Sequence, residues 1–236
     1  MLAEKKDFMS IVDRLRIVEQ KGKYGYKVLY VEAAPEIRSM CIEPVPADIR
    51  YPDGYCGDAN WKRQLVQLPL PWTLYRITVS EELGGKRVYP NITHISSLRG
   101  PIRRDTKMLY FLPLPNVYGN WESISYCALE TPPVPQESDL MNAAWGIENF
   151  WASSFRYIMV PGQWRDGYDV SSDKVAERLK ILRWLGMPSV KAARYSDLPG
   201  LYKKWEELSL AKAQQLPWGK APLGSFKEFV EATENI

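Results

Sequence analysis

Few residues of this 236-residue chain carry catalytic or metal-binding chemistry. It has one histidine, His94, and three widely spaced cysteines, Cys41, Cys56 and Cys127. A cysteine thiolate is a nucleophile that can form covalent acyl intermediates. Metal sites of the common kinds need several histidine, cysteine or carboxylate ligands together, and the sequence holds no such cluster. We therefore expect no metal and no cofactor, which narrows the possible chemistry to the cysteines.

The composition is typical of a soluble globular protein, with 45% hydrophobic and 25% charged residues. The 31 basic and 28 acidic residues leave a net charge of +3, which predicts no polyanion partner by itself. The chain lacks a phosphate-binding glycine motif, a signal peptide and any apolar run of about 18 residues that could span a membrane. An odd number of cysteines is typical of a reducing compartment. These features predict a cytoplasmic protein with no membrane partner.

The first half of the sequence predicts one helix followed by an antiparallel β-meander. Apolar residues at three- and four-residue steps favour a helix over residues 8–18, with Gly22 as its stop. Residues 44–60, rich in proline and glycine, predict an ordered surface loop, and Gly84-Gly85 predicts a hairpin turn. β-branched and aromatic residues predict strands. These strands are residues 26–31, 37–42, 72–79, 87–89 and 107–112.

The second half predicts helices. One begins at Ser138 or Asp139 and another at Ser171 or Ser172, because serine and aspartate are favourable N-caps. The first of these buries Leu140, Ala144, Ile147, Trp151 and Phe155 on one face. A third contains Leu201, Trp205 and Leu208, and the last begins at Ser225, with Glu228 at capping-box spacing. The predicted fold class is α+β, with an α+β domain over residues 1–160 and a helical extension over residues 161–236.

One stretch resembles a known protein family. Residues 109–130 run from a strand into Pro115-Asn116-Val117-Tyr118 and then to Cys127. Ubiquitin-conjugating enzymes are similar in layout, with a His-Pro-Asn turn before the thioester-forming cysteine, and Leu114 here stands in the histidine position. The closer resemblance is to the prokaryotic ubiquitin-conjugating-enzyme-like family D, which includes protein B of the PRTRC system. That family also has a later helix with an acidic residue and paired aromatics, similar here to residues 148–155.

This resemblance implies a ubiquitin-conjugating-like scaffold of phage or plasmid type, and hence a protein that is cytoplasmic in a bacterial host or virion-associated. In an active member, Cys127 would carry a ubiquitin-like protein as a thioester, and Asn116 would donate a hydrogen bond to the oxyanion. The partners would then be a ThiF-like activating protein and a small β-grasp carrier. In a non-catalytic member, the partners would be the subunits of an assembly.

The residues around Cys127 favour binding over catalysis. Glu122 and Glu130 are anions that would raise the pKa of a nearby thiol and so reduce its reactivity. A lone cysteine between Tyr126 and Ala128 is also typical of a small buried side chain. Asn116 after a proline is typical of a turn residue that bonds its own backbone. We therefore expect a binding or assembly protein, with the thioester carrier as the alternative.

Basic residues between positions 86 and 107 suggest a second alternative, nucleic-acid binding. The only acidic residue that opposes them in this stretch is Asp105. Lysine and arginine side chains contact phosphates, but they also occur on solvated hairpin edges, where they prevent edge-to-edge pairing. The cluster comprises Lys86, Arg87, Arg99, Arg103, Arg104 and Lys107. His94 lies in an alternating segment and is expected to be a structural histidine of a strand.

Overall fold

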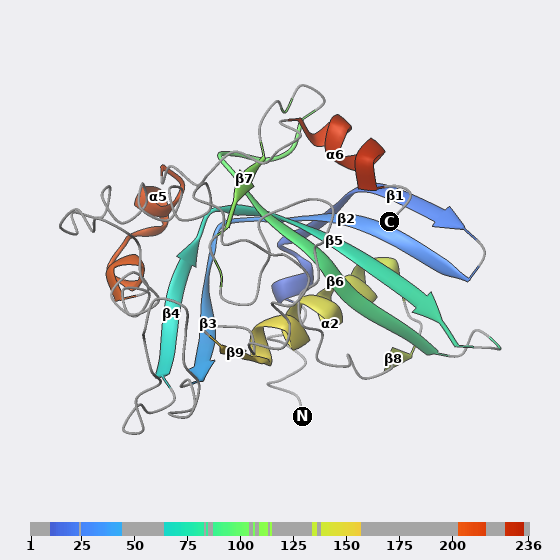
Figure 1. Ribbon diagram of the computed structural model, residues 1–236, viewed down its shortest axis with the longest axis horizontal. Helices are drawn as coiled ribbons and strands as arrows, with labels where there is room; N and C mark the ends of the chain where they lie inside the picture. Colours follow the sequence, from blue (N-terminus) through green and yellow to red (C-terminus); the bar gives the residue numbers. More distant parts are fainter. Residues whose placement is uncertain are drawn as a thin grey trace, which may run out of the picture.

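The computed structural model describes residues 10–23, 25–43, 64–82, 84, 87–103, 106, 109–112, 114, 134–135, 138–156, 203–215 and 225–233. Within them the protein is α+β, with antiparallel strands and a few helices (Figure 1). The strands are β1 (Leu15–Lys23), β2 (Tyr26–Ala33), β3 (Glu36–Glu43), β4 (Gln64–Leu70), β5 (Trp72–Glu81), β6 (Arg87–Leu98), β7 (Tyr110–Phe111), β8 (Val134–Pro135) and β9 (Ser154–Arg156). The helices are α2 (Asp139–Ala152), α5 (Leu210–Ala213) and α6 (Phe226–Thr233).

The main sheet is antiparallel, with strand order β1-β2-β5-β6-β7 and with β8 paired to β6. Two glycines with positive φ lie in its hairpin turns, Gly25 between β1 and β2 and Gly84 between β5 and β6. Glycine adopts such angles without the steric cost that a Cβ atom would bring. The predicted hairpin at Gly84 is therefore confirmed, and its return strand continues to Leu98.

A second sheet, of order β4-β3-β9, continues the same antiparallel hairpin. Ala33 of β2 pairs with Thr73 of β5, and three residues later in the chain Glu36 of β3 pairs with Leu70 of β4. The pairing register therefore continues unbroken from the main sheet into the second sheet. The hairpin bends at Pro35 and Pro71, which lack the N–H group that a straight strand would use in pairing. The predicted antiparallel strands are confirmed, but β2 and β3 do not pair with each other as in a meander. They follow one another across the bend, β2 pairing with β5 and β3 with β4 in a separate sheet (Figure 1).

Both faces of the main sheet are buried. Alternate residues of its strands point to opposite faces, and each face has its own hydrophobic core. Along β2, Leu29 and Val31 join the larger core beneath α2, whereas Val28 and Tyr30 join a smaller core that includes Phe229 of α6. In Figure 1, α2 and α6 flank the sheet on opposite sides. Such two-sided burial fixes the register, since a one-residue slip would exchange the two faces.

Helix α2 begins where the sequence predicts. The Ser138 side chain accepts a hydrogen bond from the backbone N–H of Met141. The predicted inner face is confirmed for Ala144, Ile147 and Trp151, which are buried. The helix ends at Ala152, however, and Phe155 belongs to β9 instead, so the prediction was wrong by one turn.

The described C-terminal segments pack on the strands. Trp205 is fully buried and donates from its indole nitrogen to the Pro69 carbonyl at 2.9 Å. The capping box of α6 is confirmed, because Ser225 N–H donates to Glu228 and Glu228 N–H donates to Ser225 Oγ. The helix expected from Ser171 or Ser172 and the loop over residues 44–60 lie outside the described residues, and the boundary at residue 160 stays a prediction.

The helix predicted over residues 8–18 is wrong in its second half. Residues 10–12 are helical, but β1 begins at Leu15 and pairs with β2. Val12, in the helical turn, and Leu15, in β1, are both buried. Their three-residue spacing therefore resembled one face of a helix. Gly22, expected to stop a helix, lies within β1. Pairing with a distant strand outweighs the weak local preference here.

Candidate functional site

The residues of the predicted cysteine chemistry lie mostly outside the described part of the chain. Neither Asn116 nor Cys127 is among the described residues. Leu114, which stands in the histidine position of the resembling turn, is described and is fully packed in the larger core. Cys41 on β3 is a free, partly buried thiol. The thioester hypothesis therefore stays a prediction from the sequence.

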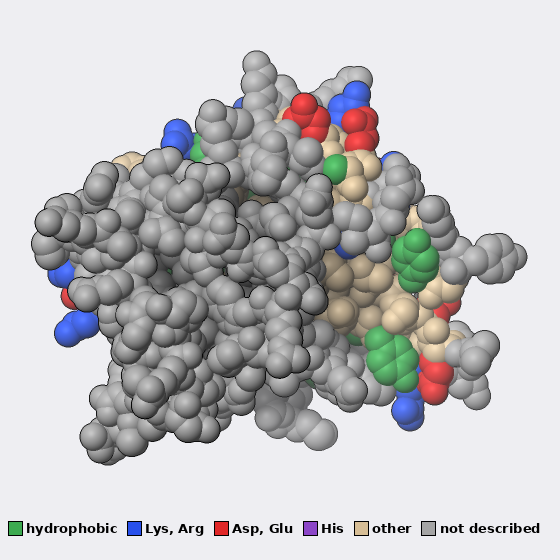
Figure 2. All heavy atoms as spheres, viewed as in Figure 1, with side chains coloured by type: hydrophobic (Ala, Val, Ile, Leu, Met, Phe, Trp, Pro, Cys, Tyr) green, Lys and Arg blue, Asp and Glu red, His purple; other side chains and the backbone are tan. Residues whose placement is uncertain are grey.

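The predicted basic cluster does not form one patch among its described members. Arg87 begins β6, whereas Arg99 and Arg103 follow its other end. At about 3.3 Å per residue, the twelve steps from Arg87 to Arg99 span roughly 35–40 Å of strand. In the view of Figure 2, basic and acidic side chains are interspersed on the described surface. Lys86, Arg104 and Lys107 lie outside the described residues.

His94 is a structural side chain, as the sequence predicts. It lies on β6, is 8% exposed, and its Nε2 atom is hydrogen-bonded to Ser96 Oγ. Its ring packs against Phe229 of α6, with ring centroids 4.5 Å apart. Burial, together with the nearby Arg76 guanidinium, lowers the pKa of His94 to about 3. The folded protein therefore holds a neutral imidazole at physiological pH.

The lowered pKa of His94 predicts a pH-dependent stability. Below about pH 6.5 the unfolded chain protonates this residue and the folded chain does not, so stability falls by about 1.4 kcal/mol per pH unit down to about pH 3. Because the chain has one histidine, its imidazole resonance is assigned without mutagenesis. We expect that resonance to be unchanged from pH 8 to pH 5 in the folded protein. A titration with a midpoint near 6.5 would contradict the burial of His94.

A buried ionic cluster joins β3 to α2. Arg38 donates from Nη1 to Glu148 Oε1 of α2, and its Nε atom lies 2.8 Å from Glu36 Oε1, an ion pair whose angles lie outside those of a hydrogen bond. The side chains of Arg38 and Glu36 are each 8% exposed. Burial raises the pKa of Glu36, although Arg38 opposes that rise. This cluster fixes α2 over the inner face of the bent hairpin.

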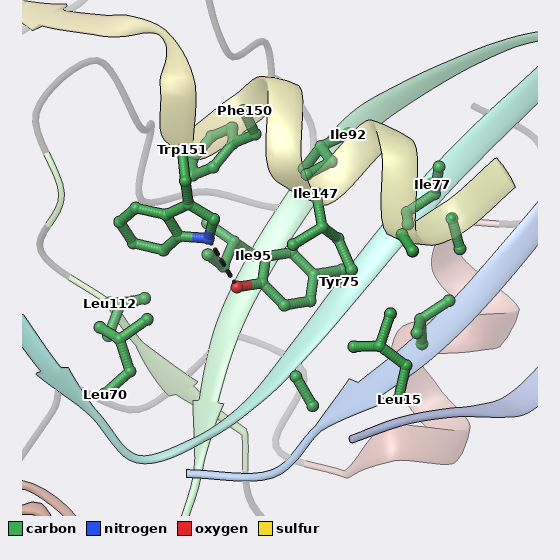
Figure 3. Close-up of a cluster of buried hydrophobic side chains, with 14 of the residues drawn as sticks. Leu15, Leu70, Tyr75, Ile77, Ile92, Ile95, Leu112, Ile147, Phe150 and Trp151 are labelled. Carbon is green, nitrogen blue, oxygen red and sulfur yellow. Dashed lines mark hydrogen bonds between the residues drawn. The ribbon is translucent and has the colours of Figure 1, made fainter. Parts of the chain in front are cut away.

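A second buried contact lies beside the cluster, between α2 and β5. Trp151 donates from its indole nitrogen to the Tyr75 hydroxyl at 2.9 Å, as Figure 3 shows. Phe150 packs edge-on against Trp151, with ring centroids 5.2 Å apart. The segment around Glu148 is therefore part of a helix that packs on the sheet. Burial also raises the pKa of the Tyr75 phenol.

The strand that follows α2, β9, pairs with the edge of β3 that lies opposite β4. After the helix ends, β9 pairs in parallel with β3, so that Ser154 lies opposite Cys41. The other edge of the hairpin is covered as well, since the Gln67 N–H of β4 donates to Glu206 at 2.8 Å. The β3–β4 hairpin is thus anchored along its inner face and at both edges.

The outer face of this hairpin exposes apolar side chains. Ile37 on β3 is 58% exposed and Leu65 on β4 is 67% exposed. Strand pairing places Cys41 opposite Leu65 and Ser39 opposite Gln67 on that same face. The face carries no charged side chain between Ile37 and Cys41 or between Leu65 and Pro69. We call these residues, Ile37, Ser39, Cys41, Leu65 and Gln67, the β3–β4 outer face.

The alternation along β3 runs opposite to the usual pattern of a half-buried strand. The charged residues Glu36 and Arg38 point inward, and the apolar Ile37 points outward. Sequence reasoning identified the strand but missed the face, because strict alternation gives the period and not the direction. This inversion was the available signal, since the buried charges Glu36 and Arg38 flank the exposed Ile37.

The described part of the chain offers neither a metal centre nor a membrane-spanning helix. It contains no group of three or more histidine, cysteine or carboxylate side chains that could hold a metal ion. None of its helices has the length and apolar character needed to cross a membrane. No protein family, curated protein or solved structure matches the chain.

Proposed function

We propose that this chain is a non-catalytic binding or assembly protein that docks a protein partner on its β3–β4 outer face. The observation that carries the proposal is the exposure of Ile37 and Leu65 on one rigidly held, uncharged face. The cores of protein interfaces are depleted in charged residues, and exposed apolar groups mark binding sites when they gather on one surface. The scaffold would be of the ubiquitin-conjugating-like type that the sequence resembles.

The anchoring of the hairpin supports this proposal. A preformed face loses little conformational entropy when a partner binds, so its apolar area contributes more to affinity. Here Arg38 and Glu148 hold the inner side, while β9 and Glu206 hold the two edges. The ion pairs of Arg38 lie on the inner side, and the five side chains of the β3–β4 outer face themselves carry no charge. Both features favour docking of an apolar protein surface.

The proposal predicts that Leu65→Asp abolishes complex formation without unfolding the protein. An aspartate at a 67% exposed position costs little in the free chain, but it would bury a charge in the complex. We expect protein from its native cells to elute with a mass above that of one chain and Leu65→Asp to elute as one chain. Light scattering after size exclusion measures the mass, and thermal melting checks the fold.

Tyr26→Asp is the matched control, because Tyr26 is also an exposed hydrophobic residue, 38% exposed, but lies on β2 at the far end of the sheet. It should keep the complex. Wild-type protein that elutes alone as a single chain would sink the proposal. Equal loss of the complex in both variants would show that the effect is not specific to the β3–β4 outer face.

The alternative function is a thioester carrier that uses Cys127 with Asn116. It rests on the sequence motif, and its test is intact mass after incubation with an activating protein and a β-grasp carrier, with and without reductant. Our proposal expects no reductant-sensitive adduct. An adduct that forms on the wild type but not on Cys127→Ser would replace our proposal with the catalytic one.

A further inference from the structure

A cavity of about 410 Å³ lies between the end of β6 and α5. The described residues that line it are Arg99, Ala211, Gln214 and Gln215. In Figure 1, α5 lies beside the end of the sheet where β7 pairs with β6. Ligand cavities usually measure about 300–1,000 Å³, so this one has room for a small organic molecule and far exceeds a single ion. It is separate from the β3–β4 outer face, so the inference goes beyond the proposed function.

The Arg99 side chain in this cavity is positioned by an aromatic ring rather than by a carboxylate. The Arg99 guanidinium carbon lies 5.1 Å from the centre of the Tyr110 ring, a cation–π contact. Tyr110 is itself positioned, because it pairs with Ser97 and its carbonyl accepts a hydrogen bond from Ser97 Oγ at 3.3 Å. Among the described residues no acidic side chain forms an ion pair with Arg99. Its donors are therefore available to an anion.

The opposite wall supplies neutral hydrogen-bonding groups. The backbone N–H groups of Gln214 and Gln215 are used within the helical turn, where they donate to Leu210 and Lys212. Their side-chain amides bond to no other described residue. Each amide offers both donors and an acceptor, which matches the mixed donor and acceptor edge of a nucleobase. A bare phosphate or carboxylate could accept hydrogen bonds from Arg99 and from the amide N–H groups, but it would leave the amide oxygens without a donor.

We propose that this cavity binds a nucleotide, with Arg99 on the phosphate and the amides of Gln214 and Gln215 on the base. Planar guanidinium groups bind phosphate oxygens in pairs, and glutamine side chains pair with base edges. The nucleotide could be free or part of a single strand, since both present the same phosphate and base. Of the six basic residues predicted as a cluster between positions 86 and 107, this proposal uses Arg99 alone.

The test is calorimetric titration of the full chain with adenosine monophosphate, cytidine monophosphate, inorganic phosphate and a ten-nucleotide single strand. We expect a nucleotide or the strand to bind, and Arg99→Gln to weaken that binding at least tenfold. Arg87→Gln is the matched control, because it removes the same charge at the far end of β6 and should leave affinity unchanged. Gln214→Ala with Gln215→Ala should weaken nucleotide binding more than phosphate binding.

Binding of a mononucleotide would identify a free ligand, and binding of the strand alone would identify a strand site, provided that each depends on Arg99. Two results would overturn the proposal. One is no binding of any nucleotide or strand at millimolar concentration. The other is an equal loss in Arg87→Gln, which would indicate diffuse charge attraction. Thermal melting of each variant separates lost binding from lost folding, and Arg99→Lys, which keeps the charge, should bind with intermediate affinity.

Discussion

Replacing Arg38 with methionine is expected to lower the free energy of unfolding by about 3–5 kcal/mol at pH 7, because it leaves two carboxylates without their cation. Glu36 is almost fully buried and Glu148 is partly buried, so neither is well solvated. Burial already raises the pKa of Glu36, and Arg38 lowers it. Without Arg38 the pKa of Glu36 rises further. At low pH the buried Glu36 is then protonated and neutral, but as the pH increases it ionises without a cation beside it, which destabilises the fold. The loss of stability in Arg38→Met should therefore be larger at pH 8 than at pH 4, as urea unfolding would show.

The matched control is Lys27→Met. Lys27 on β2 also forms an ion pair with α2, through Asp139 at 3.1 Å, but both side chains are a quarter to a third exposed. Such a pair contributes roughly 0–1 kcal/mol. Adding Glu148→Gln to Arg38→Met should recover part of the lost stability, since it removes one stranded charge. A change below 1 kcal/mol in Arg38→Met would contradict a buried cluster at this position.

Replacing Trp151 with alanine is expected to cost about 3–5 kcal/mol, the range for truncating a buried aromatic side chain. The indole is 4% exposed and fills the core between α2 and the sheet, as Figure 3 shows. Its removal also leaves the buried Tyr75 hydroxyl without its donor. Trp151→Phe keeps most of the apolar contact and should cost about 1–3 kcal/mol, the cost of an unsatisfied buried polar group.

Trp145 on the same helix provides the comparison. It is 42% exposed, so Trp145→Ala should cost less than about 1 kcal/mol. Denaturant titrations followed by far-ultraviolet circular dichroism measure all three variants, because the signal does not depend on the number of tryptophans. Similar losses for Trp145→Ala and Trp151→Ala would contradict the orientation of α2 on the sheet.

The sequence predicted the elements whose signals are local. Ser138 and Ser225 are serine caps, and Gly84 provides the positive φ of a hairpin turn. Strands β2 and β5 contain many β-branched and aromatic residues, so their existence could be predicted from composition alone. The α+β class followed from this order of elements.

Long-range pairing decided what the sequence could not predict. β1 continues from a short helical turn, and only its pairing with β2 makes it a strand. β4 was not among the predicted strands, and it contains Pro69, a residue that strand interiors seldom hold, yet its register with β3 is continuous. The contact between Arg38 and Glu148 joins residues 110 positions apart and has no local signal. The candidate face was therefore visible only once β3 was placed against α2.

The most direct test of the binding proposal is photo-crosslinking from the β3–β4 outer face in cells that naturally make the protein. Leu65 is replaced by the photoreactive residue p-benzoylphenylalanine, and Tyr26 is replaced in the same way as the control. We predict a discrete protein adduct from position 65, its loss when Ile37→Asp is added, and no such adduct from position 26. No adduct from position 65, or the same adduct from both positions, would contradict the proposal that this face binds a partner.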